Sequence, residues 1–355
     1  MRQFFNSFID VLGRSKHPLI LVGGGARLSS DLFKQFLESY QIPVVMSLLG
    51  LDVLPYSHPQ RVGFIGTYGN RWANRALGTC DLLLVLGSRL DSRQTGERSS
   101  FGNRLIYHVD IDSAELNNNI KGCVTLRSDL SQFLQFAIDD KGTYDSGKWV
   151  RITDEIPICK GINPNAFIRE LSQLSPLAGA FIADVGSNQM WCAQSLRLQN
   201  NQRFITSGGM GAMGYSLPAA IGASIALKTP IVAISGDGGF QINIQELETI
   251  ERNNLPIKMV ILNNGCLGMI RQFQDAYFES RYQSTVTDYG CPDFNEVARA
   301  YDIDSSSITF KESIKNGLSW MWKDPMAPYL LNVNIDMHTD VQPKVLWGDP
   351  LTKMD

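Results

Sequence analysis

The chain has 355 residues, of which 44% are hydrophobic and 19% are charged, and its formal net charge is −3. This composition is that of an ordinary globular protein with room for roughly two domains. Without a basic excess, nucleic acid is not expected as a partner. No apolar run has the length of a membrane span, and the N-terminus is too polar for a signal peptide. We therefore expect no membrane contact and a cytoplasmic location.

The first expected domain, residues 1–145, alternates short apolar runs with helical patterns. Gly23, Gly24 and Gly25 follow the first apolar run without forming G-x-G-x-x-G, which argues against a nucleotide-binding dehydrogenase. Strands that alternate with helices predict a parallel, doubly wound sheet. The expected strands are residues 18–22, 43–46, 81–86 and 105–109, and the expected helices are residues 4–14, 30–39, 71–77 and 129–138.

Two arginines, Arg89 and Arg93, come directly after the expected strand at residues 81–86. Ligands of open α/β sheets bind at the carboxyl ends of the strands, and two guanidinium groups there can clamp a diphosphate. Solvated surface arginines remain the alternative interpretation of these two residues.

A linker is expected at residues 146–162, where the apolar period is lost. The second domain is expected over residues 163–340, and residues 341–355 form an irregular tail. Asn163 and Pro164 are typical of a helix start. The expected helices of this domain are residues 163–174, 218–227, 245–253, 294–301 and 314–322, and its expected strands are 179–183, 231–234, 259–262 and 329–335, the last with the alternation of an edge strand.

The unit that organises this domain is a strand, a Gly-Asp-Gly-Gly turn, a helix and a second strand that ends at Asn263 and Asn264. A parallel crossover of this kind brings Asp237 and Asn264 to the same carboxyl edge of the sheet. Gly236, Gly238 and Gly239 allow a sharp turn, and one carboxylate with one amide oxygen suits Mg²⁺ beside a diphosphate. Taken alone, Gly-Asp-Gly also marks any tight turn.

Together, the Gly-Asp-Gly and Asn-Asn pair and the run at residues 206–223 resemble the cofactor segments of thiamine-diphosphate enzymes, and the whole chain resembles the acetolactate synthase family. The resemblance implies an α/β fold of two doubly wound parallel-sheet domains. It implies that Mg²⁺ is bound by Asp237, Asn264 and the main-chain carbonyl of Cys266. The thiamine diphosphate residues that it implies are Gly186, Ser187, Asn188, Gly209, Gly211, Met213, Gly236, Asp237, Gly238, Gly239, Asn264, Gly268 and Met269.

In this family Met213 is expected to bend the cofactor, Met269 to lie beside it, and Phe273 to influence the choice of substrate. The first domain resembles the family's central domain, in which FAD is mostly structural. The FAD residues that the resemblance implies are Gly23, Gly24, Gly25, Ser47, Leu48, Gly66, Thr67, Tyr68, Arg89, Asp91, Arg93, Asp110, Ile111 and Asp129.

The family's glutamate, which assists the aminopyrimidine of the cofactor, belongs to a pyrimidine-binding domain that we do not find in these residues. We therefore expect no catalytic glutamate in this chain, a pyrimidine-binding domain or subunit in trans, and a homo- or hetero-oligomer. Glu246 and Glu248 are interpreted as a solvated helix face. The family usually has Gln-His at Ser187-Asn188, Trp at Phe273 in members that prefer 2-oxobutyrate, and commonly His at Tyr68.

Three kinds of function stay open at this stage. The first is a decarboxylase or carboligase that acts on pyruvate or a related 2-oxo acid, with a sugar-linked ketone as an alternative acceptor. The second is a cofactor-binding half without catalysis of its own, and the third is the dehydrogenase. The six cysteines have no C-x-x-C pair, so a zinc site and a disulfide framework are poorly supported.

Overall fold

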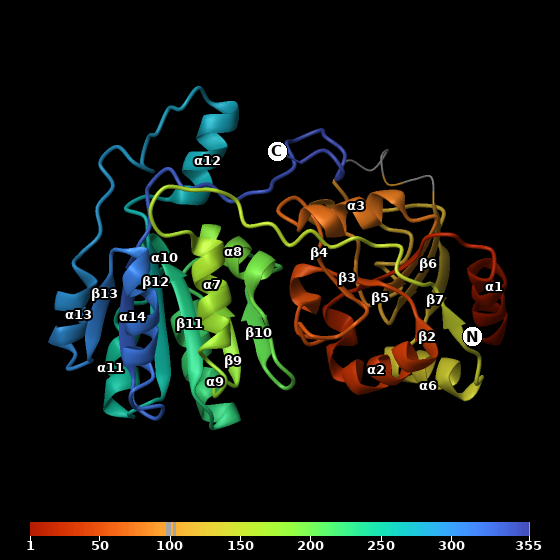
Figure 1. Ribbon diagram of the computed structural model, residues 1–355, viewed down its shortest axis with the longest axis horizontal. Coiled ribbons are helices and arrows are strands. Elements are labelled where there is room, and N and C mark those ends of the chain that lie inside the picture. The colour runs from red at the N-terminus through yellow and green to blue at the C-terminus, as the bar shows by residue number, and fades with distance from the viewer. Residues whose placement is uncertain (97–100, 102–103, 355) are drawn as a thin grey trace. The chain divides into compact units, whose positions relative to one another are not determined.

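The computed structural model describes residues 1–96, 101 and 104–354, and it divides into two compact units. The first comprises Met1–Glu155 with Gln342–Asp355, and the second comprises Ile156–Val341. Each unit is a parallel sheet with helices on both faces (Figure 1). The expected fold class is therefore confirmed.

The sheet of the first unit has the strand order β4-β3-β1-β5-β6-β7, with every pair parallel. Leu83 and Val85 pack with α3 on one face, and Tyr107 contacts Phe4 of α1 on the other, with ring centroids 5.2 Å apart. The strands are β1 (Pro18–Val22), β3 (Val44–Met46), β4 (Arg61–Phe64), β5 (Leu82–Leu86), β6 (Leu105–Asp110) and β7 (Val124–Arg127). The helices are α1 (Arg2–Leu12), α2 (Ser30–Ser39), α3 (Arg71–Thr79), α4 (Ser92–Thr95) and α6 (Leu130–Asp139).

Smaller elements complete this unit. The 3-10 turns η1 (Gly24–Ser29) and η2 (Leu48–Gly50) follow β1 and β3, and a two-stranded sheet joins β2 (Tyr40–Gln41) to β8 (Tyr144–Asp145). The C-terminal segment has neither helix nor strand among its described residues, as expected. It is nevertheless packed, since Val345, Leu351 and Met354 are buried in the core of this unit.

The sheet of the second unit has the order β10-β9-β11-β12-β14-β13, again with every pair parallel. Its strands are β9 (Ala180–Ala183), β10 (Arg203–Thr206), β11 (Ile231–Gly236), β12 (Ile257–Asn263), β13 (Ser305–Ile308) and β14 (Tyr329–Asn334). Its helices are α7 (Pro164–Gln173), α8 (Ser187–Ser195), α9 (Ser216–Leu227), α10 (Asp237–Ile242), α11 (Glu246–Arg252), α12 (Gly268–Tyr277), α13 (Phe294–Ala300) and α14 (Ile314–Met321), with the 3-10 turn η3 (Lys311–Ser313).

Helices α9, α11 and α13 cover one face of this sheet, and α7, α8 and α14 cover the other (Figure 1). The start of α7 agrees with the prediction, because the side chain of Asn163 accepts a hydrogen bond from the backbone N–H of Ala166 at 2.9 Å and Pro164 follows it. The Gly-Asp-Gly-Gly turn is tighter than expected, since Asp237 already begins the short helix α10.

One strand prediction is wrong. The strand at residues 329–335 was expected at an edge, but β14 lies between β12 and β13 and is buried over Tyr329–Val333. The edge strand is β13, whose sequence of three serines and one isoleucine has no alternating apolar pattern. The alternation in β14 therefore does not indicate an exposed face.

Candidate functional site

The predicted cofactor residues of the second unit follow four neighbouring strands of its sheet. Asp184 comes after β9, Ser207 after β10, Asp237 after β11 and Asn264 after β12. The strand order of the sheet reverses between β9 and β11, since β10 lies on one side of β9 and β11 on the other. Open α/β sheets bind ligands at the carboxyl ends of the strands beside such a point.

Asp237 and Asn264 meet at this edge, as predicted from the parallel crossover, and the main-chain carbonyl of Cys266 lies beside them. One end of the Asn264 amide lies 3.1 Å from Oδ1 of Asp237 and 2.8 Å from the main-chain oxygen of Cys266. An amide nitrogen at that position would donate to both oxygens. An amide oxygen there would complete a set of three oxygens that a bound cation could hold together.

The chemistry of this set fits Mg²⁺, which prefers oxygen ligands and usually retains waters and substrate phosphates in its coordination sphere. Asp237 is 1% exposed, and its burial raises the pKa of the carboxyl above the ordinary aspartate value. Burial also raises the pKa of the Cys266 thiol to about 11, so the thiol is protonated at neutral pH and its carbonyl is the available donor. Among the described residues, His, Cys, Asp and Glu side chains form no group of three that could hold a metal.

Two glycines give this edge its close backbone approach. A Cβ on Gly238 would lie 2.6 Å from Cδ2 of Leu267, and a Cβ on Gly268 would lie 2.4 Å from Nδ2 of Asn264. A side chain at either position would require the side chain of Leu267 or Asn264 to shift. These glycines therefore leave room for Leu267 and Asn264 in their present positions.

Ser187 and Asn188 begin α8 at the same edge, but they differ in what their side chains contact. The amide nitrogen of Asn188 donates to the main-chain oxygens of Asp184 at 2.7 Å and Ile234 at 3.4 Å, which joins the ends of β9 and β11. The hydroxyl of Ser187 lies 3.2 Å from the position of a Cβ on Gly268. Of the two predicted phosphate donors, Ser187 is thus the one next to the glycine at the start of α12.

The other predicted residues lie around this edge. Cε of Met213 is 3.8 Å from the position of a Cβ on Gly238, which places Met213 beside the turn after β11. Met269 is half-buried in the first turn of α12, and Phe273 is exposed one turn later, with its ring centroid 4.7 Å from that of Tyr277. Gly186, Gly209, Gly211, Gly236 and Gly239 belong to the loops and helix starts that follow β9, β10 and β11.

Sequence reasoning missed two residues of this site, Asp184 and Tyr289. Asp184 is completely buried, and its carboxylate accepts backbone hydrogen bonds from Val185, Gly214 and Ser216. An acidic residue at the end of an apolar strand was a usable signal for it. The phenol of Tyr289 donates to Oδ2 of Asp237 at 2.9 Å, and no local pattern in the sequence points to that contact.

In the first unit, the predicted FAD residues follow the six strands of the sheet. Gly23, Gly24 and Gly25 follow β1; Ser47 and Leu48 follow β3; Gly66, Thr67 and Tyr68 follow β4; Arg89, Asp91 and Arg93 follow β5; Asp110 ends β6 and Ile111 follows it; and Asp129 follows β7. The sheet order reverses between β1 and β5. A Cβ on Gly23 would lie 2.1 Å from the carbonyl oxygen of Gly87, so the loops after these two strands are in contact.

The charged residues of this edge have structural partners as well. Asp91 caps α4 and Asp129 caps α6, each by accepting two backbone hydrogen bonds. Arg89 donates to Oδ2 of Asp91 from Nε and from one terminal nitrogen, both at 3.2 Å. Both interpretations of Arg89, as a ligand clamp and as a surface arginine, are compatible with this arrangement.

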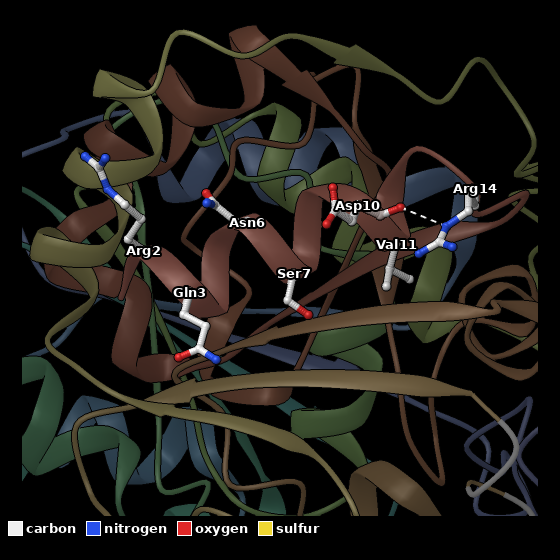
Figure 2. Close-up of a pocket in the computed structure, with 7 residues that line it drawn as sticks. All are labelled: Arg2, Gln3, Asn6, Ser7, Asp10, Val11 and Arg14. Atoms are coloured by element: carbon white, nitrogen blue, oxygen red, sulfur yellow. Dashed lines mark hydrogen bonds between the residues drawn. The ribbon is translucent and has the colours of Figure 1, made fainter.

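A separate groove of about 650 Å³ runs along α1 (Figure 2). It is lined by residues of α1 and the turn that follows it: Arg2, Gln3, Asn6, Ser7, Asp10, Val11 and Arg14. Ser7 shares a hydrogen bond of 2.7 Å with the hydroxyl of Tyr107, and Arg14 donates to the main-chain oxygen of Asp10 at 3.1 Å. No predicted site residue lines this groove, so it adds nothing to the two strand edges.

In the described part of the chain, no helix combines the length and the apolar character that crossing a bilayer requires. Comparison with known families gives two matches. Residues 5–136 match the family described as "Thiamine pyrophosphate enzyme, central domain". Residues 184–333 match "Thiamine pyrophosphate enzyme, C-terminal TPP binding domain".

Curated relatives match almost the whole chain. It is 36% identical over 356 residues to the acetolactate synthase isozyme 2 large subunit of Escherichia coli, covering 97% of the chain and 64% of that protein. It is 36% identical to the acetolactate synthase large subunit of Lactococcus lactis, covering 95% of the chain and 60% of the relative. It is 33% identical to the chloroplastic acetolactate synthase 1 of Zea mays, covering 99% of the chain and 59% of that protein. The chain thus spans less than two thirds of the length of these relatives.

Proposed function

We propose a function on the premise that the chain belongs to the thiamine pyrophosphate enzymes, of which it carries the central and the C-terminal TPP binding domains. Its curated relatives are acetolactate synthase large subunits, and the proposal is that it acts as an acetolactate-synthase-like decarboxylase or carboligase on pyruvate or a related 2-oxo acid. The observation that carries the proposal is the meeting of Asp237, Asn264 and the Cys266 carbonyl at the ends of β11 and β12.

Mg²⁺ would be held by the three oxygens of this set, and it would link them to the diphosphate of the cofactor. Ser187 and the close backbone at Gly238 would contact the phosphate oxygens, while α8 and α12 begin at the same edge and present N–H groups to an anion. Thiamine diphosphate, when bound, supplies an electron sink for decarboxylation. Met213, beside the turn, would contact the thiazolium ring.

We propose FAD as a structural cofactor of the first unit. The support is that every predicted FAD residue lies at the carboxyl edge of one sheet, whose strand order reverses between β1 and β5. Gly23 and Gly25 lie against the loop after β5, and Arg89 and Arg93 follow the same strand. An elongated dinucleotide with a central diphosphate suits such an edge.

For the acceptor substrate, the proposal has two candidates, a second 2-oxo acid and a sugar-linked ketone. Phe273 is 46% exposed on α12, next to the rings of Tyr277 and Phe278, and it forms an aromatic surface near Met269. An exposed aromatic surface can stack on a sugar ring as well as cover a small 2-oxo acid. A sugar-linked ketone is therefore the second candidate acceptor.

We also propose that the pyrimidine end of the cofactor and its glutamate are supplied by a pyrimidine-binding domain or subunit beyond these residues, within an oligomer. The contacts of Glu246 and Glu248 are consistent with this proposal. Glu248 is exposed, and Glu246 accepts a hydrogen bond from Thr249 on its own helix. Both residues belong to α11, which follows the turn and short helix that carry Asp237 in the chain.

The test combines binding with turnover. Calorimetric titration of thiamine diphosphate is expected to show binding with Mg²⁺ and loss of binding with EDTA, whereas thiamine without phosphates should bind weakly under both conditions. Supplying a pyrimidine-binding domain by fusion should raise pyruvate consumption by roughly 10²- to 10⁴-fold, the size of general acid–base assistance. Binding that ignores Mg²⁺, or acetolactate formation that does not respond to the added domain, would contradict the proposal.

A further inference from the structure

The two carboxylate oxygens of Asp237 have different surroundings. Oδ1 faces the Asn264 amide at 3.1 Å, on the side of the Cys266 carbonyl. Oδ2 accepts a hydrogen bond of 2.9 Å from the phenol of Tyr289, which lies 52 positions further along the chain. Because Asp237 is 1% exposed, water has little access to either oxygen. Tyr289 therefore holds the carboxylate oxygen that points away from the oxygen set.

The surroundings of Tyr289 show that this contact belongs to the fold. The position of a Cβ on Gly238 is 3.2 Å from the Tyr289 hydroxyl, so a glycine at 238 leaves room for the phenol. Its segment is fixed at Thr285, whose main-chain oxygen accepts from the N–H of Leu267 at 3.0 Å and whose hydroxyl donates to Gln274 at 2.5 Å. The position of Tyr289 therefore does not depend on its own hydroxyl.

We propose that Tyr289 is a positioning residue of the metal site, which keeps Asp237 a one-oxygen ligand and so favours Mg²⁺ over Ca²⁺. The proposal rests on the Mg²⁺ site of the proposed function. Mg²⁺ requires short bonds in a near-octahedral arrangement, whereas Ca²⁺ accepts longer bonds and binds carboxylates through both oxygens. As long as the phenol donates its hydrogen bond to Oδ2, Asp237 does not bind a cation through both of its carboxylate oxygens.

The Tyr289→Phe variant removes the hydroxyl and keeps the ring. Outer partners of metal ligands typically contribute 10- to 100-fold to metal affinity, so we expect Mg²⁺ binding to weaken by about that factor. Ca²⁺ binding should weaken less or become tighter, since Oδ2 is then available to it. The measurement is calorimetric titration of each metal into metal-free protein that contains excess thiamine diphosphate.

The matched control is Tyr282→Phe in the same segment. The hydroxyl of Tyr282 donates to Asp275 and has no contact with Asp237 in the structure, so its removal should leave the ratio of Ca²⁺ to Mg²⁺ affinity unchanged. The thermal midpoint of metal-free Tyr289→Phe protein should stay close to that of the wild type, because Thr285 holds the segment.

The outcomes separate this inference from the proposed function. A wild-type chain that binds neither metal in the presence of thiamine diphosphate would overturn both. Wild-type binding with unchanged Mg²⁺ affinity in Tyr289→Phe would overturn the role of Tyr289 alone. Equal weakening of Mg²⁺ and Ca²⁺ would also overturn it, because that is the result of a merely structural role.

Discussion

The carboxylate of Asp184 accepts a hydrogen bond of 2.8 Å from the backbone N–H of Ser216, although 32 positions separate the two residues. Its other oxygen accepts from the N–H groups of Gly214 at 2.9 Å and Val185 at 2.8 Å. The end of β9 is thereby tied to the loop that carries Met213 and leads into α9. One buried carboxylate thus shapes the wall of the candidate site.

For Asp184→Asn we expect a loss of about 1–3 kcal/mol in the free energy of unfolding, the usual cost of a buried donor without a partner. An asparagine turns one acceptor oxygen into a donor that faces a backbone N–H. Urea unfolding measures the loss, and hydrogen exchange should show faster exchange at the Gly214 and Ser216 amides.

Asp293→Asn is the matched control for that substitution. Asp293 also accepts two backbone hydrogen bonds, at 2.9 and 3.3 Å, but it is exposed at the start of α13. Asparagine caps helices about as well as aspartate, so this variant should be nearly neutral. If both variants lose the same stability, burial is not the cause of the loss at Asp184.

For the proposed metal set, Asp237→Ala should abolish the Mg²⁺ dependence of thiamine diphosphate binding, with a loss of affinity of at least roughly 100-fold, since outer partners alone contribute 10- to 100-fold. Cys266→Ala should bind almost normally, because alanine retains the main-chain carbonyl. Calorimetry with and without Mg²⁺ distinguishes the two variants. Equal losses would rule out the carbonyl as the donor.

For the proposed FAD edge, the Arg89→Ala, Arg93→Ala double variant should bind FAD more weakly than either single variant. A hydrogen bond to a charged group contributes about 1.5–3 kcal/mol, so each arginine that binds phosphate should change affinity by roughly 10- to 100-fold. Quenching of flavin fluorescence during titration measures the binding.

Arg14→Ala serves as the control for the FAD experiment, since Arg14 lies just after α1 and donates to the main chain of that helix (Figure 2). Its affinity for FAD should equal that of the wild type. Wild-type protein that is colourless and takes up no added FAD would refute the FAD proposal outright.

Lys258 predicts a pH dependence of stability. Its side chain is completely buried and donates to the main-chain oxygens of Asp324 at 2.6 Å and Ala327 at 2.5 Å, and burial lowers its pKa to about 8 from the usual 10.5. Between these two pH values the unfolded chain binds more protons than the folded chain. Stability relative to Lys258→Met should therefore rise with pH across this window, by at most about 3 kcal/mol.

Lys323→Met is the comparison for that measurement. Both lysines lie over the Tyr329 ring, with the Lys258 and Lys323 ammonium groups 4.5 and 5.2 Å from its centroid. The Lys323 side chain is exposed, however, and the hydrogen bond that it donates to the Asp304 carboxylate raises its pKa. Because the pKa of Lys323 is raised on folding, its contribution to stability falls with rising pH. Stability relative to Lys323→Met should therefore not rise with pH as it does relative to Lys258→Met. Urea unfolding at several pH values tests both, and identical profiles for the two lysine variants would refute the effect of burial.

Much of the candidate site could be read from local patterns. The apolar runs before Asp237 and Asn264, with a helical pattern between them, predicted two parallel strands and therefore a shared edge, which the structure has. The glycines predicted a close approach to the backbone, and side chains of Leu267 and Asn264 do lie against Gly238 and Gly268. These features follow from short stretches of chain, because strand pairing across a helical crossover has one favoured hand and direction.

The sequence by itself therefore determined the two parallel sheets and the strand ends that carry Asp237 and Asn264. Only the tertiary structure decided that β14 lies inside the sheet and that Asn188 donates hydrogen bonds to the ends of β9 and β11. The contact of Tyr289 with Asp237 was likewise decided only there. Hydrophobic periodicity reports which face of an element is buried, but it does not report which distant segment covers that face. A hydrogen bond across 52 positions depends on how loops pack, and no local pattern encodes that packing.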